Sequence, residues 1–129
     1  MAIFKRRHLR KVLSGDKTQT RRSHKYTWKL GKTYCIRDRW FSKPQGHIIV
    51  TRKFKQRLGD VNPEDIRKEG YSNIEEFKQA WEEIHGPKSW DPDLVVIVYE
   101  FKLTDFKKLR RGYLPYETLR KTRLLITIP

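Results

Sequence analysis

The sequence predicts an α+β fold: a small β-barrel with inserted helices. Two observations support this prediction. Several long strand-like segments have helical patterns inserted between them, and closing such strands into a barrel removes exposed sheet edges. The chain has 129 residues with four Trp, six Tyr and six Phe. This length suits one domain, and the aromatic content is sufficient for a compact core despite the many charges.

The first element expected is an amphipathic helix over residues 4–14. Its basic residues occupy one face, and its apolar face comprises Phe4, either His8 or Leu9, Val12 and Leu13. Gly15 suits the left-handed position just after a helix C-terminus. A short strand is expected over 18–22. A half-buried strand then follows a turn at Gly31, and a hairpin loop at 43–46 leads into a long strand over 47–58.

The middle of the chain is expected to be helical. Asn62 and Pro63 suit the cap and first position of a short helix to residue 68. Ser72 and Glu75 have capping-box spacing and predict a helix over 73–85. The apolar face of that helix comprises Ile74, Phe77, Trp81 and Ile84. The apolar run 94–101 predicts a strand buried on both faces.

We expect residues 104–129 to be a basic C-terminal extension packed on the same domain. We expect this tail to pack as a helix or an extended arm and to end in a strand over 124–128. An exposed apolar end would invite aggregation, so the final strand is expected to pair with the sheet. The cations of the tail would then extend a basic face.

The formal net charge of +15 is distributed unevenly. Residues 1–57 carry 18 Lys/Arg and 2 Asp/Glu, residues 58–101 carry 4 and 11, and residues 102–129 carry 8 and 2. Lys and Arg clustered in this way indicate a protein that binds a polyanion. The alternative is a heat-stable protein with a solvated charged surface, which explains many charges but not their two-to-one cationic excess.

The segment 14–22, "SGDKTQTRR", concentrates groups that recognise ligands. Glycine allows close approach of the backbone, Lys and Arg hold phosphate, and Thr hydroxyls donate to phosphate or to a base edge. The candidate ligand-binding residues here are Gly15, Lys17, Thr18, Thr20, Arg21 and Arg22. The alternative is a polar hairpin with solvated cations. Lys17 and Arg22 are the favoured contacts.

Three aromatic residues, Trp28, Trp40 and Phe41, lie among cations that include Arg37 and Arg39. Single-stranded nucleic acids bind to such mixtures by stacking bases on the rings. Core packing is the commoner fate of Trp in a small domain, so one of the three aromatics is expected to stack. Arg37, Arg39 and Trp40 join the candidate RNA-binding residues.

Several pieces in order resemble the ASCH domain family, whose fold is similar to the PUA domain. They are "GDKTQTRR", "LGKTYCI", the segment from "GHIIVTRKFKQRLGDV" to "GYSNIEEFKQAW", and "VVIVYEF", within residues 1–103. The resemblance implies RNA binding in translation or RNA metabolism. The alternative comes from similar bacterial members that are amidohydrolases and deacetylate N4-acetylcytidine. The basic tail departs from the compact hydrolases, which favours a macromolecular ligand.

By resemblance to the deacetylating members, the catalytic set would be Lys17, Thr20 and Glu69. Thr20 would be the nucleophile, Lys17 its base, and Glu69 a proton carrier or orienting group. Lys17 must then be neutral, which requires burial or neighbouring cations. In a regular strand Lys17 and Thr20 would face opposite sides, so they converge only if Lys17 lies in the turn before the strand.

Other classes of site are disfavoured. The four His lack metal-ligand spacing and the one Cys has no partner, so no metal site and no cofactor are expected. Cys35 in a strand pattern suits an inert core residue. No signal peptide or run of about 20 apolar residues is visible. A cytoplasmic protein without membrane contact is expected, with the monomer as the favoured state.

Overall fold

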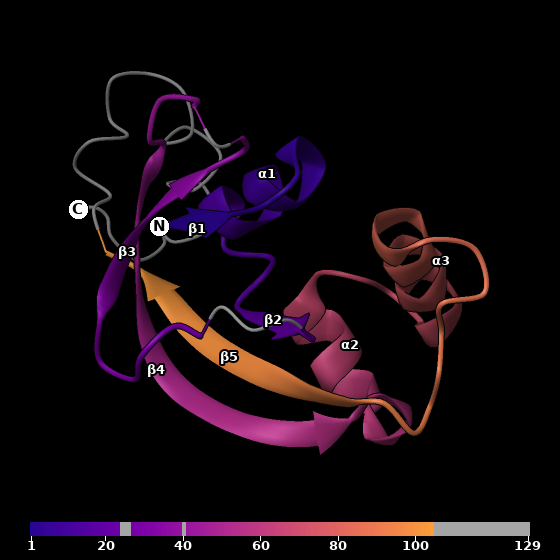
Figure 1. The fold of residues 1–129 in the computed structure, drawn as a ribbon. Helices are drawn as coiled ribbons and strands as arrows, with labels where there is room; N and C mark the ends of the chain where they lie inside the picture. Colours follow the sequence, from indigo (N-terminus) through magenta and orange to yellow (C-terminus); the bar gives the residue numbers. More distant parts are fainter. Residues whose placement is uncertain (24–26, 40, 105–129) are drawn as a thin grey trace.

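The computed structural model describes residues 1–23, 27–39 and 41–104. Within these residues, three helices and five strands follow one another (Figure 1). In chain order they are β1 (Ala2–Ile3), α1 (Arg6–Ser14), β2 (Gln19–Arg22), β3 (Thr33–Arg37), β4 (Gly46–Arg57), α2 (Pro63–Glu69), α3 (Ile74–His85) and β5 (Val95–Leu103), with a 3₁₀ turn over Leu58–Asp60 before α2.

The five strands form one sheet in the order β1-β3-β4-β5-β2. β4 and β5 are long antiparallel partners that curve together, so the sheet curls as a half-barrel (Figure 1). The predicted α+β fold with a barrel-like sheet is confirmed. The two-residue β1, which pairs parallel to β3, was not predicted. It is too short to show a sequence period.

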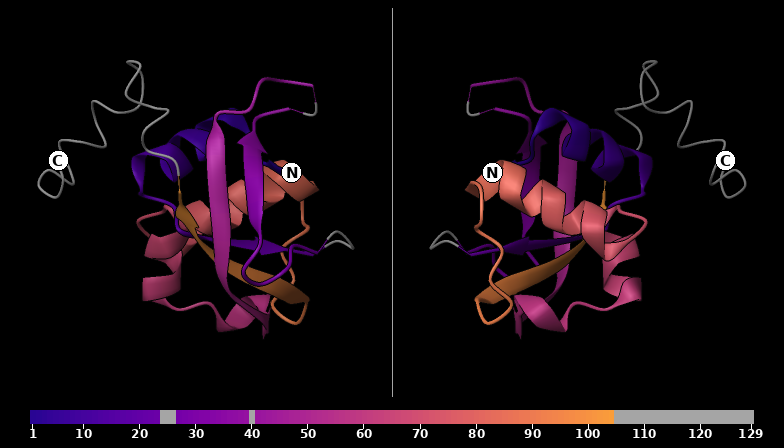
Figure 2. Two further views of the ribbon diagram at one scale, coloured as in Figure 1. Left: turned by 90° about the vertical axis from the view of Figure 1, so that its left-hand side faces the viewer. Right: turned by 90° about the vertical axis from the view of Figure 1, so that its right-hand side faces the viewer.

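β5 is buried on both faces, as its apolar run predicts. Val96 and Val98 belong to a hydrophobic cluster with residues of α2 and α3. Tyr99 and Phe101 project from the opposite face into a second cluster with α1 and β1. The alternation of a strand therefore divides the core into two parts. Figure 2 shows α1 and α3 on one side of the molecule and the β3–β4 part of the sheet on the other.

α1 begins two residues later than predicted, and both His8 and Leu9 are buried on its inner face. Gly15 ends the helix in the left-handed conformation with φ 88°. α2 is capped as predicted by Asn62. The carboxylate of Asp65 accepts from the Asn62 backbone N–H, and the Asn62 side chain accepts from the Asp65 N–H, which completes a capping box.

Two predictions for α3 are wrong. The N-cap is Asn73 rather than Ser72, because the Asn73 side chain accepts from the Glu76 backbone N–H. Ile84 is 44% exposed and does not join the core, whereas Trp81 is 4% exposed and does. Ile84 and His85, in the last turn of α3, line a cavity instead of the hydrophobic cluster, so the continuing helical period no longer means burial.

The predicted tail, including its final strand over 124–128, lies outside the described residues. No described helix has the length and apolar character needed to cross a membrane.

Candidate functional site

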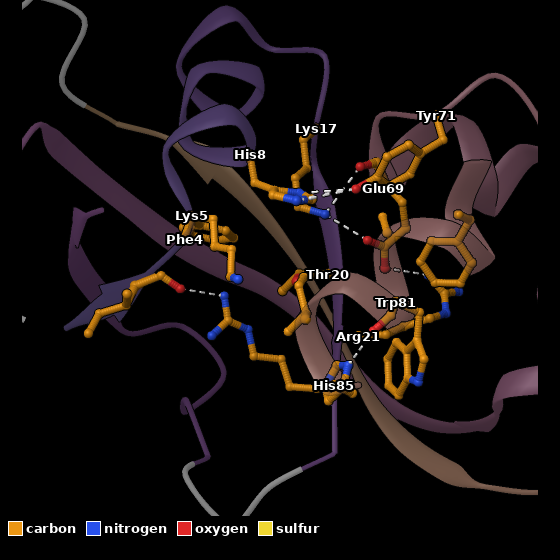
Figure 3. A pocket seen from close by; sticks show the side chains of 15 residues that line it. Phe4, Lys5, His8, Lys17, Thr20, Arg21, Glu69, Tyr71, Trp81 and His85 are labelled. Atoms are coloured by element: carbon orange, nitrogen blue, oxygen red, sulfur yellow. Dashed lines mark hydrogen bonds and ion pairs between the residues drawn. The ribbon is translucent and has the colours of Figure 1, made fainter. Parts of the chain in front are cut away.

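A cavity of about 290 Å³ lies between α1, β2, the end of α2 and α3 (Figure 3). Its polar lining includes Lys17, Thr20 and Glu69, and its apolar lining includes Phe77 and Trp81. Mostly apolar concavities with a few convergent polar groups are typical of small-molecule sites. The cavity brings together side chains from both parts of the core.

The turn between α1 and β2 positions Lys17. The backbone N–H of Gly15 donates to Val12 and that of Lys17 to Lys11, at 3.2 and 3.0 Å, so the helix end is closed by its own carbonyls. The Thr18 N–H donates to the Lys68 carbonyl at 2.8 Å, which ties this turn to α2. Lys17 is thus held before the strand begins, the condition under which it shares a side with Thr20.

Glu69 is the last residue of α2 and is 3% exposed. Gly70 follows it with φ 98°, a conformation that glycine adopts without strain. A Cβ at Gly70 would lie 3.0 Å from the Lys11 side chain, so this glycine also allows α1 to approach closely. The backbone therefore directs the Glu69 carboxylate into the protein, away from solvent.

The Glu69 carboxylate is shared by two cations. Lys17 Nζ donates to Oε1 at 2.6 Å, and Arg21 Nη1 donates to Oε2 at 2.9 Å. Lys17 Nζ also donates to the Glu69 backbone carbonyl at 3.1 Å. Burial with full pairing satisfies these charges, while loss of one partner would leave a charge buried alone.

Arg21 is completely enclosed among polar partners. Its guanidinium also pairs with Asp65 at 3.3 Å, and it donates to the side-chain Oε1 of Gln56 at 2.8 and 3.0 Å and to the side chain of Gln19. The side chain is 0% exposed. Its hydrogen bonds therefore go to protein groups from β2, β4 and α2 rather than outward to a phosphate.

Thr20 lies in β2 opposite Tyr99 of β5 and is 6% exposed. In Figure 3 it lies at the middle of the cavity lining, with Lys17 and Glu69 to one side and Trp81 and His85 to the other. Within the described part of the chain its hydroxyl makes no hydrogen bond to protein, so this hydroxyl faces the cavity as an unengaged polar group.

The surroundings of Lys17 act on its protonation in opposite directions. Burial is the largest influence and lowers the pKa of the Lys17 ammonium below its ordinary value. The Glu69 carboxylate opposes this shift, and the positive charges of Arg22 and Arg21 reinforce it. The net direction is downward, toward a neutral amine, which is what a base requires.

Arg22 lies at the β1 side of the cavity. Its Nη2 donates to the Ile3 carbonyl at 2.8 Å, and its guanidinium carbon lies 4.8 Å from the Phe4 ring and 4.7 Å from the Trp28 ring. Burial lowers the pKa of Arg22 to about 10, so it remains cationic at neutral pH. Arg22 is therefore a charged donor placed against an aromatic wall.

Two cavity residues were not recognised in the sequence as site residues. His8 and Tyr71 meet across the cavity, with the Tyr71 hydroxyl 3.1 Å from His8 Nδ1. Burial is the largest influence on the pKa of His8 and lowers it to about 4, and the charge of Lys17 adds to this. The one sequence signal is the position of Tyr71 directly after Glu69 and Gly70, whereas His8 resembles any residue of an apolar helix face.

The other predicted ligand-binding residues lie elsewhere. Gly15 and Thr18 are exposed at the turn and do not line the cavity. Arg37 Nη1 donates to the Ser42 carbonyl at 2.7 Å, and Arg39 is exposed in the following loop. Trp40 lies outside the described residues.

The two remaining aromatics and the cysteine have separate fates. Trp28 is 6% exposed and packs in the core, and Phe41 is 92% exposed. Cys35 is half-buried in β3 rather than a full core residue. Among the described residues, no group of His, Cys, Asp and Glu is arranged to hold a metal ion.

Comparison with known proteins identifies the fold. No family model matches the sequence, and no curated protein matches it. The structure is similar to an ASCH domain from Lactobacillus crispatus JV V101, with a TM-score of 0.63 and 16% identity over 76% of this chain and 70% of that one.

A second solved structure, a DUF984 protein from Enterococcus faecalis V583, matches with a TM-score of 0.59 and 24% identity over the same shares. At these identities the likeness establishes the fold. This chain folds as an ASCH-like domain.

Proposed function

We propose that this protein is an amidohydrolase that removes an acyl group from the exocyclic nitrogen of a nucleoside base. One observation carries the proposal: Lys17, Thr20 and Glu69, which come from a turn, a strand and a helix end, line one cavity with a mostly apolar wall. The ASCH-like sequence pattern contributes N4-acetylcytidine as the first substrate to test.

The reaction proceeds in two steps. Thr20 Oγ attacks the acyl carbonyl carbon while its proton passes to neutral Lys17, and an oxyanion forms. The C–N bond then breaks, the leaving amine takes the proton from Lys17, and an acyl ester remains on Thr20. Water then attacks this ester while Lys17 takes its proton. The ester bond breaks, Thr20 Oγ takes the proton back from Lys17, and the carboxylic acid is released. Glu69 accepts and returns a proton through its bond to Lys17.

The shared carboxylate supports this division of roles. Because Arg21 binds one oxygen of Glu69 and Lys17 the other, Glu69 is not free to stabilise the Lys17 ammonium alone. Burial and the adjacent guanidiniums favour the neutral amine. The same pairing fixes both side chains in place, which is the preorganisation that catalysis needs.

Release of acetate from N4-acetylcytidine tests the proposal. The wild-type protein should turn over, Thr20→Ala should abolish turnover, and Thr18→Ala should not, since Thr18 is exposed outside the cavity. Turnover that survives Thr20→Ala would contradict the nucleophile assignment. If the wild type does not release acetate over a broad pH range, the amidohydrolase proposal is wrong.

RNA binding is the second candidate, and a separate observation favours it. Exposed cations lie on or near α1 and on β4. They are Lys5, Arg6, Arg7 and Arg10 near or on α1, and Arg52, Lys53, Lys55 and Arg57 on β4. Titration with single-stranded and structured RNA over a range of salt tests this candidate, since phosphate contacts give a steep salt dependence.

A further inference from the structure

The amidohydrolase proposal needs a hydrogen-bond donor for the oxygen that becomes negative in the transition state. Such donors are the largest single contribution in many acyl-transfer enzymes. Arg21 is occupied by protein acceptors, and Lys17 is assigned as the base. Arg22 lies at the β1 side, against Phe4 and Trp28. The Tyr71 hydroxyl lies beside Lys17 and Glu69 (Figure 3).

The hydrogen bonds of His8 determine what Tyr71 can donate. Arg7 Nε can only donate, and it lies 3.3 Å from His8 Nε2, so Nε2 accepts. In a neutral imidazole the proton then resides on Nδ1, which is the ring nitrogen nearer to the Tyr71 oxygen, at 3.1 Å against 3.4 Å for Nε2. His8 therefore donates to Tyr71, and the hydroxyl proton of Tyr71 remains free to bind another acceptor.

Several contacts hold this arrangement in place. Arg7 also pairs with Glu83 of α3, so its guanidinium bridges α1 and α3. The Tyr71 ring packs under Lys11 Nζ, at 4.3 Å from the ring centroid, and beside Phe77. Burial raises the pKa of Tyr71 to about 12 and lowers that of His8 to about 4. At neutral pH the tyrosine is therefore a donor and the histidine is uncharged.

We propose that Tyr71 donates its hydroxyl proton in a hydrogen bond to the acyl carbonyl oxygen of the substrate, and that Arg7 and His8 orient it. This inference rests on the amidohydrolase function. Tyr71 is a catalytic residue in this assignment because it contacts a reacting atom. Arg7 and His8 are positioning residues that act through it.

Kinetics with N4-acetylcytidine test the assignment. Tyr71→Phe should lower kcat by about 10²-fold, the loss typical of one oxyanion donor, and leave KM within about threefold. Tyr34→Phe is the matched control. It removes a hydroxyl that accepts from the Lys29 N–H away from the cavity, and activity should be unchanged. Equal melting temperatures for wild type and Tyr71→Phe would exclude a folding defect.

A spectroscopic measurement tests the orientation independently of turnover. Long-range ¹H–¹⁵N correlation spectra at pH 7 should show His8 as the Nδ1–H tautomer. The His8 signals are assigned as those that disappear from the spectrum of His8→Asn. Arg7→Met should allow the Nε2–H tautomer to appear. Arg6→Met, a neighbouring change that breaks a hydrogen bond to Asp38 and none to His8, should not. An Nε2–H tautomer in the wild type would overturn the proposal, because Tyr71 would then donate to His8.

The outcomes separate the two proposals. If the wild type turns over and Tyr71→Phe keeps its kcat, the inference is wrong and the amidohydrolase function stands. Lys5 also lines the cavity. Loss of kcat in Lys5→Met with none in Tyr71→Phe would assign the donor to Lys5 and would also overturn the inference. If the wild type releases no acetate, the function fails and the Tyr71 assignment with it.

Discussion

The two strands that flank β5 both carry cations, but their surroundings are opposite. On the β2 side, Lys17 and Arg21 are buried and paired with carboxylates from α2. On the β4 side, Arg52 is 61% exposed and stacks on Phe54, and Lys53 and Lys55 are exposed as well. The same residue types are thus buried and paired in one place and exposed to solvent in the other, so a charge total alone does not assign a function.

The largest difference between the two sides should appear in the free energy of unfolding when one cation is removed from each. Arg21→Met should destabilise the protein by about 3–5 kcal/mol, because Asp65 and Glu69 would lose a buried partner. Arg52→Met, a matched change on β4, should alter stability by about 1 kcal/mol or less. Urea unfolding measures both. A loss below about 1 kcal/mol for Arg21→Met would mean that the carboxylates take up protons without cost.

A smaller loss of stability should occur when the pH is lowered, because His8 is buried as a neutral ring. Its pKa is lowered from 6.5 to about 4 in the folded protein, so between these values the unfolded chain binds more protons. The contribution of the neutral His8 ring to the free energy of unfolding is therefore at its maximum above pH 6.5, and it is lost as the pH falls toward 4. We expect a loss of about 1–2 kcal/mol, since solvent that enters the cavity reduces the effect of burial.

The difference between wild type and His8→Asn isolates this contribution, because the carboxylates titrate in both proteins. The free energy of unfolding of the variant should depend less steeply on pH between 6.5 and 4. Parallel curves for the two proteins would show that His8 titrates normally in the folded state.

The comparison also explains which features could be predicted from sequence. Local signals succeeded: Asn62-Pro63 marks a helix start, Gly15 a helix end, and the run 94–101 a doubly buried strand. Ser72 and Asn73 are adjacent cap residues followed by two adjacent glutamates, so the local pattern allows two registers, and the structure selects the second.

Burial of polar groups was harder to predict because the partners are distant in sequence. Arg21 contacts Gln56 and Glu69, which lie 35 and 48 residues away. His8 contacts Tyr71, 63 residues away. Lys17, Thr20 and Glu69 were proposed by resemblance, and the structure brings them to one cavity. Composition favoured an exposed basic surface for the same segment.

The salt dependence of nucleic-acid binding should also differ between variants on the β4 side and variants on the β2 side. If β4 binds RNA phosphates, the triple change Arg52→Met, Lys53→Met and Lys55→Met should reduce the slope of log K against log salt by about 0.7 for each phosphate that is no longer bound. Lys17→Met should leave the slope unchanged, because its ammonium is enclosed. Fluorescence anisotropy with a labelled single strand measures both. Equal slopes for wild type and the triple variant would remove β4 from the interface.

The smallest effect is expected at the end of β4, where an ion pair is present but exposed. Arg57 Nη2 lies 3.0 Å from Asp93 Oδ1, with side chains 53% and 80% exposed. Water screens this pair, and ordering two long side chains offsets the attraction. Arg57→Met should therefore change the free energy of unfolding by about 0.5 kcal/mol or less, although the geometry resembles that of Arg21 with Glu69. A loss near that of Arg21→Met would show that ion-pair geometry, rather than burial, sets the value of these cations.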